Sequence, residues 1–175
     1  MPSNIEIKAR ARDFAAMRAR AEELADGPVQ VIPQEDTFFS VAHGRLKLRE
    51  RVADPAQLIY YERADEGGPK RSDYQIFETG DPASLKSTLG RALGIRGVVR
   101  KTRYLYLIDQ TRVHLDDVQG LGQFMELEVV LRAGQADADG QAIAEELMAK
   151  LGVERSDLLE GAYMDLLEER SSPDK

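Results

Sequence analysis

The segment Arg45-Leu46-Lys47-Leu48-Arg49-Glu50-Arg51 decides the fold. Charged and apolar side chains alternate along it, and successive side chains of a β-strand point to opposite faces. The pattern therefore predicts a strand with four cations on one face, namely Arg45, Lys47, Arg49 and Arg51. Like charges at this spacing repel one another by roughly a few tenths of a kcal/mol per pair on an open surface. A strand of this kind needs an anion that compensates it.

Other segments place charge on one strand face in the same way. Glu6 and Lys8 share a face opposite Ile5 and Ile7. The remaining shared faces hold Tyr61 with Arg63, Lys101 with Arg103, Arg112 with His114 and Asp116, and Glu126 with Glu128. For any single strand, a half-buried sheet with a solvated charged face explains the alternation. Together, the cation-rich strand and the paired carboxylates make that explanation less favourable, and such a sheet can either stay open or close with its charged face inward.

Hydrophobic periodicity predicts about eight strands, with helices at both ends of the chain and one in the middle. The strands are expected at residues 5–8, 37–42, 45–52, 57–63, 72–78, 98–108, 112–118 and 123–131. The helices are expected at residues 13–25, 81–93, 140–151 and 157–169, the last with Ser156 as its cap. Most strand connections are short, which favours antiparallel neighbours. The predicted fold class is α+β, with one antiparallel sheet or barrel and flanking helices.

The domain organisation is expected to be simple. Residues 1–170 are predicted to form a single domain, and residues 171–175 a disordered tail. The two C-terminal helices carry leucines at helical spacing, which favours a role in covering the core. A homodimer contact through the same helices is the alternative.

Composition excludes several kinds of chemistry. The chain has 175 residues, no cysteine and two histidines. A disulfide scaffold, a thiolate nucleophile and a zinc site built from Cys or several His are therefore excluded. No apolar stretch approaches the roughly 20 residues that a membrane-spanning helix needs, and the N-terminus lacks a signal-peptide pattern. A cytoplasmic protein without a membrane partner is expected.

The net charge of −7 is unevenly distributed. Residues 133–175 hold 4 basic and 11 acidic side chains and so supply all of it, whereas residues 1–132 sum to zero. The overall acidity argues against nucleic acid as a partner. It does not argue against a small anion bound by the neutral, strand-rich part of the chain.

A closed barrel of about eight strands leaves a lumen wide enough for one small ligand. Lysines and arginines in that lumen suit a compact polyanion. Carboxylates among the cations suit Mg²⁺ or Mn²⁺, which prefer carboxylate and water oxygens and bridge phosphate oxygens. The residues therefore indicate a polyphosphate bound together with a divalent metal.

A series of motifs begins with Ile5-Glu6-Ile7-Lys8. It continues through 34–39, 44–49, 60–63, 68–70, 98–103, 114–116 and 121–128, and it ends at 163–167. In this order the motifs, of which the first resembles the ExExK signature, resemble the CYTH superfamily of triphosphate tunnel metalloenzymes. These include class IV adenylate cyclases, thiamine triphosphatases and inorganic triphosphatases, and the sequence is most similar to the class IV adenylate cyclase-like branch. The resemblance implies an α+β fold built on a closed antiparallel β-barrel of about eight strands with flanking helices. Its charged tunnel would bind a triphosphate, such as ATP or tripolyphosphate, with Mg²⁺ or Mn²⁺.

The resemblance also implies residue roles. The phosphate-binding cations would be Lys8, Lys47, Arg49, Arg63, Lys101 and Arg103, of which Lys47, Arg49, Lys101 and Arg103 would stabilise charge during catalysis. The metal group would be Glu6, Asp116, Glu126 and Glu128. His114 shares the tunnel face and is a further candidate for phosphate binding, with a plain hydrogen-bonding histidine as the alternative. Asn4 replaces the first glutamate of ExExK, which removes one negative charge from the metal group.

Three functions are compatible with these residues. In a triphosphatase, water attacks the terminal phosphate; in a cyclase, the ribose 3′-hydroxyl attacks the α-phosphate and pyrophosphate leaves. Both enzymes need the same tunnel, so the sequence does not separate them. The third function is a non-catalytic polyphosphate- or nucleotide-binding module, which the replacement at Asn4 keeps open.

Overall fold

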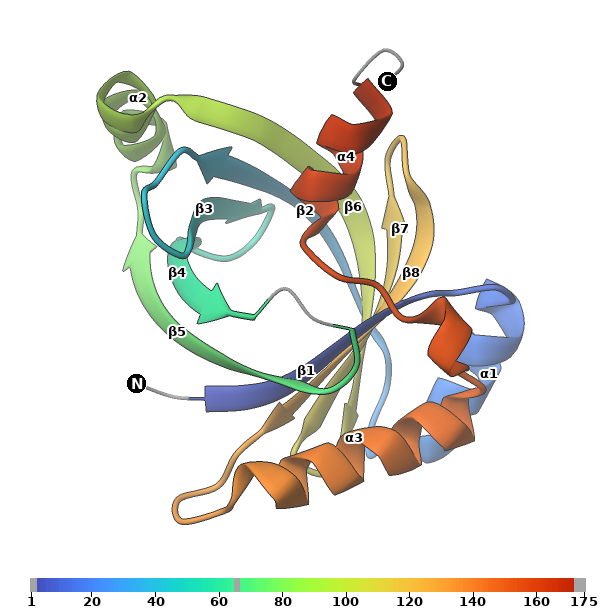
Figure 1. Cartoon of the computed structure of the whole chain (residues 1–175). Helices are drawn as coiled ribbons and strands as arrows, with labels where there is room; N and C mark the ends of the chain where they lie inside the picture. The colour runs from blue at the N-terminus through green and yellow to red at the C-terminus, as the bar shows by residue number, and fades with distance from the viewer. Residues whose placement is uncertain (1–2, 65–66, 172–175) are drawn as a thin grey trace.

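The computed structural model describes residues 3–64 and 67–171 of the chain. Eight strands close into an antiparallel barrel in the order β1-β5-β4-β3-β2-β6-β7-β8 (Figure 1). They are β1 (Ser3–Arg10), β2 (Gln30–Phe39), β3 (Arg45–Arg51), β4 (Ala56–Arg63), β5 (Lys70–Thr79), β6 (Ile95–Ile108), β7 (Thr111–Val118) and β8 (Gly122–Val130). Pairing of β1 with β8, from Asn4 opposite Val130 to Arg10 opposite Phe124, closes the ring. The predicted closed barrel with flanking helices is confirmed.

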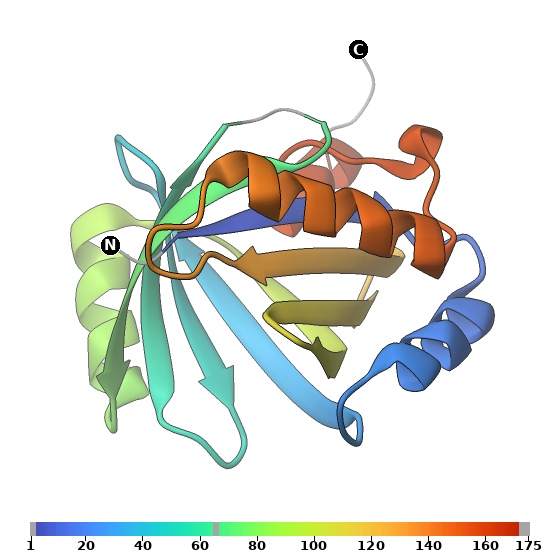
Figure 2. The same ribbon diagram turned by 90° about the horizontal axis from the view of Figure 1, so that it is seen from below.

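Three of the four helices in the described residues cover the outer, apolar face of the barrel, and the fourth lies over one of its ends (Figure 1). The helices are α1 (Phe14–Leu24), α2 (Pro82–Leu93), α3 (Asp137–Leu151) and α4 (Tyr163–Ser171), with a short 3-10 turn at Arg155–Asp157. Helix α3 lies along β1 and β8 with α1 beside it (Figure 2). Ile5, Ile7 and Leu127 face these helices and belong to the main buried cluster. The charged alternate residues of the same strands must therefore face the barrel interior.

Close packing of α3 on β1 depends on Gly140. A Cβ at this position would lie 2.6 Å from Cγ1 of Ile5 and 2.7 Å from Cδ2 of Leu131. On the other side of the barrel, α2 places Leu85 and Leu89 against the cluster of Phe39 and Leu48. No helix in the part of the chain that the structure describes is long and apolar enough to cross a membrane.

The second strand, β2, begins and ends earlier in the sequence than predicted. It was predicted at residues 37–42, whereas β2 runs from Gln30 to Phe39. Its register with β6 extends from Gln30 opposite Leu105, so β6 holds the earlier residues in an extended conformation. The register shifts between Phe38 and Phe39, where the strand ends.

The predicted helix at residues 157–169 is wrong in its first turns, and Ser156 does not cap it. The NH group of Leu159 donates to the carbonyl oxygen of Lys8 at 2.9 Å, which keeps this segment extended alongside β1. Gly161 follows with a φ of 74°, and the helix begins only at Tyr163. The carboxylate of Asp165 accepts a hydrogen bond from the NH group of Ala162 at 2.6 Å and caps this later start.

One residue of the predicted tail at residues 171–175, Ser171, belongs to a helix. Ser171 is the last residue of α4, and its hydroxyl donates to the carbonyl oxygen of Leu167 at 2.9 Å. Residues 172–175 lie outside the described residues.

Candidate active site in the barrel

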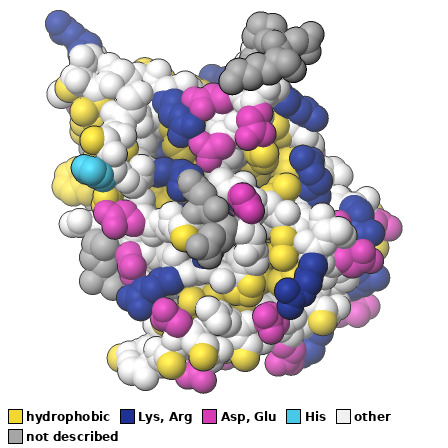
Figure 3. Space-filling view, viewed as in Figure 1, with side chains coloured by type: hydrophobic (Ala, Val, Ile, Leu, Met, Phe, Trp, Pro, Cys, Tyr) yellow, Lys and Arg dark blue, Asp and Glu magenta, His cyan; other side chains and the backbone are white. Residues whose placement is uncertain are grey.

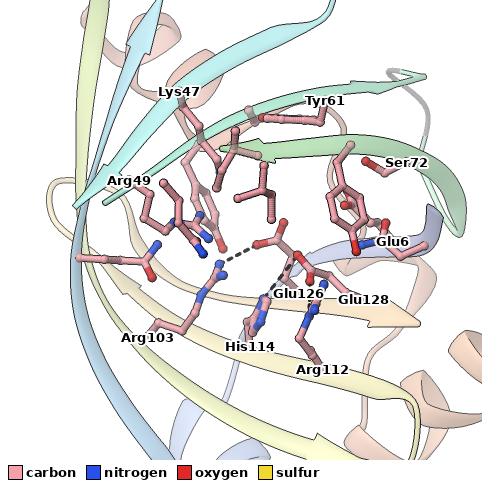
Figure 4. A pocket seen from close by; sticks show the side chains of 18 of the residues that line it. Glu6, Lys47, Arg49, Tyr61, Ser72, Arg103, Arg112, His114, Glu126 and Glu128 are labelled. Carbon is pink, nitrogen blue, oxygen red and sulfur yellow. Dashed lines mark hydrogen bonds and ion pairs between the residues drawn. The ribbon is translucent and has the colours of Figure 1, made fainter. Parts of the chain in front are cut away.

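The inward faces of all eight strands line a cavity of about 280 Å³ (Figure 4). Most of the predicted site residues meet in its wall, namely Glu6, Lys8, Lys47, Arg49, Arg63, Arg103, His114, Glu126 and Glu128. Lys101 and Asp116 are buried directly behind this wall and contact Arg103 or its partners. The alternation of each strand accounts for this convergence, because every second side chain points into the barrel.

Asp36 holds two of the predicted phosphate-binding cations. Arg49 donates two hydrogen bonds to its carboxylate, at 2.9 Å and 2.8 Å, and Nζ of Lys47 lies 3.1 Å from Oδ2. Burial would raise the pKa of Asp36, but the charges of Arg49 and Lys47 outweigh burial and hold the pKa well below its usual range. The three side chains form a fixed cationic corner of the cavity.

Asp116 holds the other pair of cations. Its carboxylate accepts hydrogen bonds from Lys101 at 3.0 Å, from Arg103 at 2.8 Å and 2.7 Å, and from the Tyr163 hydroxyl at 3.0 Å. Burial would raise the pKa of Asp116, but the charges of Arg103 and Lys101 hold the pKa below its usual value. Asp116 therefore orients Arg103, which also donates to Glu126 at 3.0 Å.

Three further carboxylates face the cavity from β1 and β8. Arg63 donates to Glu6 at 2.8 Å, and Arg112 donates to Glu128 at 2.8 Å. Glu6 stands directly opposite Glu128 in the β1–β8 register. Burial, together with repulsion from Glu128, raises the pKa of Glu6. This pair of carboxylates therefore carries an unfavourable interaction that a bound cation would relieve.

One end of the barrel, here called the covered end, is closed by the segment that leads into α4 (Figure 1). The carbonyl oxygen of Gly161 accepts hydrogen bonds from Arg63 at 2.6 Å and from Lys8 at 3.4 Å. The Tyr163 ring lies under Lys8, with 4.0 Å between Nζ and the ring centroid. Arg96 anchors α4 through Asp165, at 2.6 Å. Acidic and basic side chains lie side by side over this end (Figure 3).

The opposite end, here called the open end, combines apolar side chains with Arg51, which lines the cavity at the far end of β3 from Arg45. Ile32, Ile59, Ile76, Leu105 and Tyr74 contribute to the cavity wall there. Ile76 is 45% exposed, which shows that this end reaches the surface. The cavity thus runs from a cationic covered end to a partly apolar open end.

Burial sets the proton occupancy of the cavity's lysines and of His114. Burial lowers the pKa of Lys8 to about 7 and that of Lys47 to about 8. Burial and the charge of Arg103 lower the pKa of His114 to about 3, so this histidine is neutral near pH 7. Its Nδ1 lies 3.8 Å from Oε1 of Glu128 and has no hydrogen-bond partner among the described residues. A phosphate contact by His114 stays a prediction.

The sequence profile of the CYTH domain matches residues 3–163, almost the whole chain. The chain belongs to the CYTH domain family. This family binds triphosphate substrates, and membership implies a divalent metal ion. No curated protein matches the sequence significantly.

Solved structures share the CYTH fold of this chain. The PH1012 protein of Pyrococcus horikoshii OT3 is 24% identical, with a TM-score of 0.83 over 93% of this chain and 98% of that one. A Vibrio parahaemolyticus protein described as a candidate adenylate cyclase is 17% identical, with a TM-score of 0.78 over 94% and 97% of the two chains. The Hippeastrum protein HpAC1, a candidate adenylyl cyclase described as having a dominant triphosphatase activity, is 16% identical. Its TM-score is 0.67 over 97% of each chain.

The donor set of this CYTH domain fits a divalent cation in its chemistry. Among the described residues, no three Asp, Glu or His side chains lie close enough together to form a complete metal site. Mg²⁺ is usually held by one or two carboxylates, with substrate phosphates and water completing the coordination. Glu6 and Glu128, which repel each other across the β1–β8 pair, supply such a pair of carboxylates. The four hydrogen bonds to Asp116 occupy its carboxylate with protein donors instead.

Sequence reasoning gives no role to two residues that organise the site. Asp36 stands within the motif at residues 34–39, but the strand is expected to begin only at residue 37. Asp36 nevertheless alternates in phase with Ile32, Gln34 and Phe38, which line the cavity. Tyr163 was noted within a motif, but its place at the covered end depends on the extended segment before α4. The spacing of two residues between Asp36 and Phe38 is a sequence signal for the inward face of the strand. No local sequence pattern indicates the position of Tyr163.

Proposed function

We propose that this CYTH domain is a metal-dependent phosphoryl-transfer enzyme that hydrolyses a triphosphate bound in the barrel. The observation that carries the proposal is the grouping of buried cations at the covered end of the cavity. Lys8, Arg63 and Lys101 contact Gly161 or Tyr163 there, and Arg103 lies beside Lys101 on Asp116. Such a group suits a chain of phosphates, whose oxygens need several fixed positive charges.

The direction of entry favours attack on the terminal phosphate. A ligand that enters through the open end brings its free phosphate end deepest, among the cations of the covered end. Charge that develops on the transferred phosphoryl oxygens is then stabilised where donors are densest. Cyclase chemistry takes place at the α-phosphate, which would lie nearer the open end. The apolar side chains at that end favour an organic group on the ligand, so the cyclase is retained as the second candidate.

Each group of cations has a distinct task in this mechanism. Asp36 fixes Arg49 and Lys47, and Asp116 fixes Arg103 and Lys101, so that phosphate oxygens meet donors that are already oriented. Preorganised donors of this kind stabilise developing charge without reorganising during the reaction. Tyr163 and Gly161 keep bulk water from the covered end. When bound by Glu6 and Glu128, Mg²⁺ or Mn²⁺ would polarise phosphate oxygens and lower the pKa of a bound water.

A panel of triphosphates tests the proposal. The full chain is incubated with tripolyphosphate and with nucleoside triphosphates, in the presence of Mg²⁺ or Mn²⁺ and after chelation. Release of orthophosphate supports the triphosphatase, whereas cyclic AMP with pyrophosphate from ATP supports the cyclase. Binding without turnover of any triphosphate would support the non-catalytic module.

Substitutions show whether turnover comes from this site or from a contaminating enzyme. Glu126→Gln removes the charge that accepts a hydrogen bond from Arg103, and we expect it to lower turnover at least 100-fold. Glu146→Gln changes an exposed carboxylate on α3 that pairs only with Lys150 among the described residues, and turnover should stay within twofold. Equal activity in the two variants would refute the assignment of the site.

A further inference from the structure

Asn4 and Ser72 form a polar pair that the proposed reaction does not use. They stand directly opposite each other in the β1–β5 register, and both line the cavity. Their exposed fractions are 2% and 1%. Neither Oδ1 of Asn4 nor Oγ of Ser72 has a hydrogen-bond partner within the described part of the chain. Buried polar groups in native proteins are almost always satisfied, so this pair needs a partner from outside the chain.

The two atoms together define what that partner must offer. The amide oxygen of Asn4 only accepts hydrogen bonds, whereas the hydroxyl of Ser72 both donates and accepts. A fully ionised phosphate oxygen has no hydrogen to donate and cannot satisfy this amide oxygen. An alcohol hydroxyl satisfies both, because it donates to the amide oxygen and accepts from the serine. Cross-strand partners on one face lie about 5 Å apart at Cβ, which suits two contacts to one small group.

The position of the pair along the cavity indicates which part of a ligand reaches it. On β1 the inward residues run from Lys8 at the covered end through Glu6 to Asn4. On β5 they run from Ser72 through Tyr74 to the exposed Ile76. Ser72 lies on the same side of the cavity as Glu6 and away from Lys47 and Arg49 (Figure 4). The pair therefore stands between the charged zone and the apolar open end.

We propose that Asn4 and Ser72 bind a hydroxyl group of the ligand's organic part and thereby select an organic triphosphate that carries a hydroxyl near its phosphate chain. This inference rests on the proposed function, because the triphosphate places the organic part. The neutral amide of Asn4 also avoids the repulsion that a carboxylate at this position would exert on the phosphates. The pair of Asn4 and Ser72 adds nothing to the affinity for inorganic tripolyphosphate, which carries no alcohol hydroxyl. A site built to bind a hydroxyl discriminates strongly against an analogue without one, since its own buried groups are then left unpaired.

Equilibrium binding of analogues whose terminal phosphate cannot be hydrolysed tests this selectivity. Calorimetry compares the Mg²⁺ complexes of β,γ-methylene ATP, its 2′-deoxy and 3′-deoxy forms, and tripolyphosphate. We expect at least one deoxy form to bind about tenfold more weakly than the parent. Ser72→Ala and Asn4→Leu should weaken binding of the parent by about the same factor and leave binding of that deoxy form and of tripolyphosphate unchanged.

A matched control is available on β7. Thr111 is 1% exposed, and its Oγ1 also has no partner among the described residues, but it lies outside the cavity wall. Thr111→Val should therefore leave the selectivity intact, and thermal unfolding establishes that all three variants are folded. Equal binding of parent and deoxy ligands by the wild type, or unchanged selectivity in Ser72→Ala, would overturn the role of the pair. Failure of the wild type to bind even tripolyphosphate would instead refute the proposed function on which it rests.

Discussion

The hydroxyl of Tyr163 donates a hydrogen bond of 3.0 Å to Oδ2 of Asp116, and this bond joins α4 to the charged network inside the barrel. The same oxygen accepts from Lys101 and Arg103. Burial, together with repulsion from Asp116 in its charged form, raises the pKa of Tyr163 well above the usual value, so the hydroxyl keeps its proton. The covered end is therefore closed by a polar contact as well as by packing against Phe124, whose ring centroid lies 5.1 Å away.

Tyr163→Phe removes this donor and keeps the ring. Because the bond goes to a buried carboxylate, we expect a loss of about 2 kcal/mol in the free energy of unfolding, measured with urea. Tyr60→Phe is the control, since Tyr60 donates to the exposed Glu62 and its loss should cost at most about 0.5 kcal/mol. Equal losses in the two variants would mean that the hydroxyl of Tyr163 does not hold the covered end.

Asp36→Asn should reveal an acid-dependent part of the stability. The folded pKa of Asp36 lies well below the unfolded value of 3.8, so the carboxylate stabilises the fold above that pH and ceases to do so as the pH falls through the folded value. At pH 7 we expect the variant to lose about 3 kcal/mol, because Arg49 and Lys47 are left without their buried partner. Unfolding curves between pH 7 and pH 2 should show this difference shrinking below pH 3.8. A difference that is constant with pH would contradict the ionised state of Asp36.

Ligand binding should take up protons at Lys47. Its pKa is about 8 in the free protein, so about half of these side chains are neutral at pH 8. Phosphate oxygens nearby favour the charged form and raise the pKa, which draws in protons and weakens binding as the pH rises above 8. Calorimetry of tripolyphosphate at pH 8, in two buffers that differ in ionisation enthalpy, measures the uptake.

The source of these protons is tested by substitution. Lys47→Met should reduce the uptake, by up to about half a proton. Lys86→Met, which alters a lysine paired with Glu35 and Glu50 on the outer surface, should leave the uptake as it is. Uptake that is identical in all three proteins would exclude Lys47 as the titrating group.

The strand alternation of charged residues predicts the antiparallel strands and most of the cavity wall, whereas closure of the sheet into a barrel follows from the family resemblance. Arg49, Arg103 and Glu128 reach the interior because the period of two is a local property that closure preserves. The pairing of charges was not predictable in the same way. Asp116 is predicted to belong to the metal group, and the structure adds that its carboxylate accepts hydrogen bonds from Lys101, Arg103 and Tyr163, which come from β6 and α4. Partners so distant in sequence are set by barrel register and by the docking of α4, which no local pattern encodes.

The start of α4 shows the same limit. Leucines at helical spacing before residue 163 favoured a longer helix, but the backbone there forms hydrogen bonds with β1. The NH group of Leu159 donates to Lys8, and the carbonyl of Gly161 accepts from Arg63. These tertiary contacts outweigh the local preference for a helix.

Asn4→Glu tests how the replacement of the first glutamate of the ExExK motif affects the affinity for a divalent metal ion. The variant adds a carboxylate one inward position from Glu6, on the strand that pairs with Glu128. Since hard divalent cations bind more tightly as carboxylate charge accumulates, we expect Mn²⁺ affinity in the presence of tripolyphosphate to rise about tenfold. The same added charge should weaken binding of tripolyphosphate when no metal is present. Asn4→Gln, which lengthens the side chain without charging it, should produce neither effect, and titrations with and without Mn²⁺ measure both. Asn4→Glu could instead weaken tripolyphosphate binding and leave Mn²⁺ affinity at the level of Asn4→Gln. The metal would then lie beyond the reach of residue 4, and Glu126, rather than Glu6, would have to complete the carboxylate pair with Glu128.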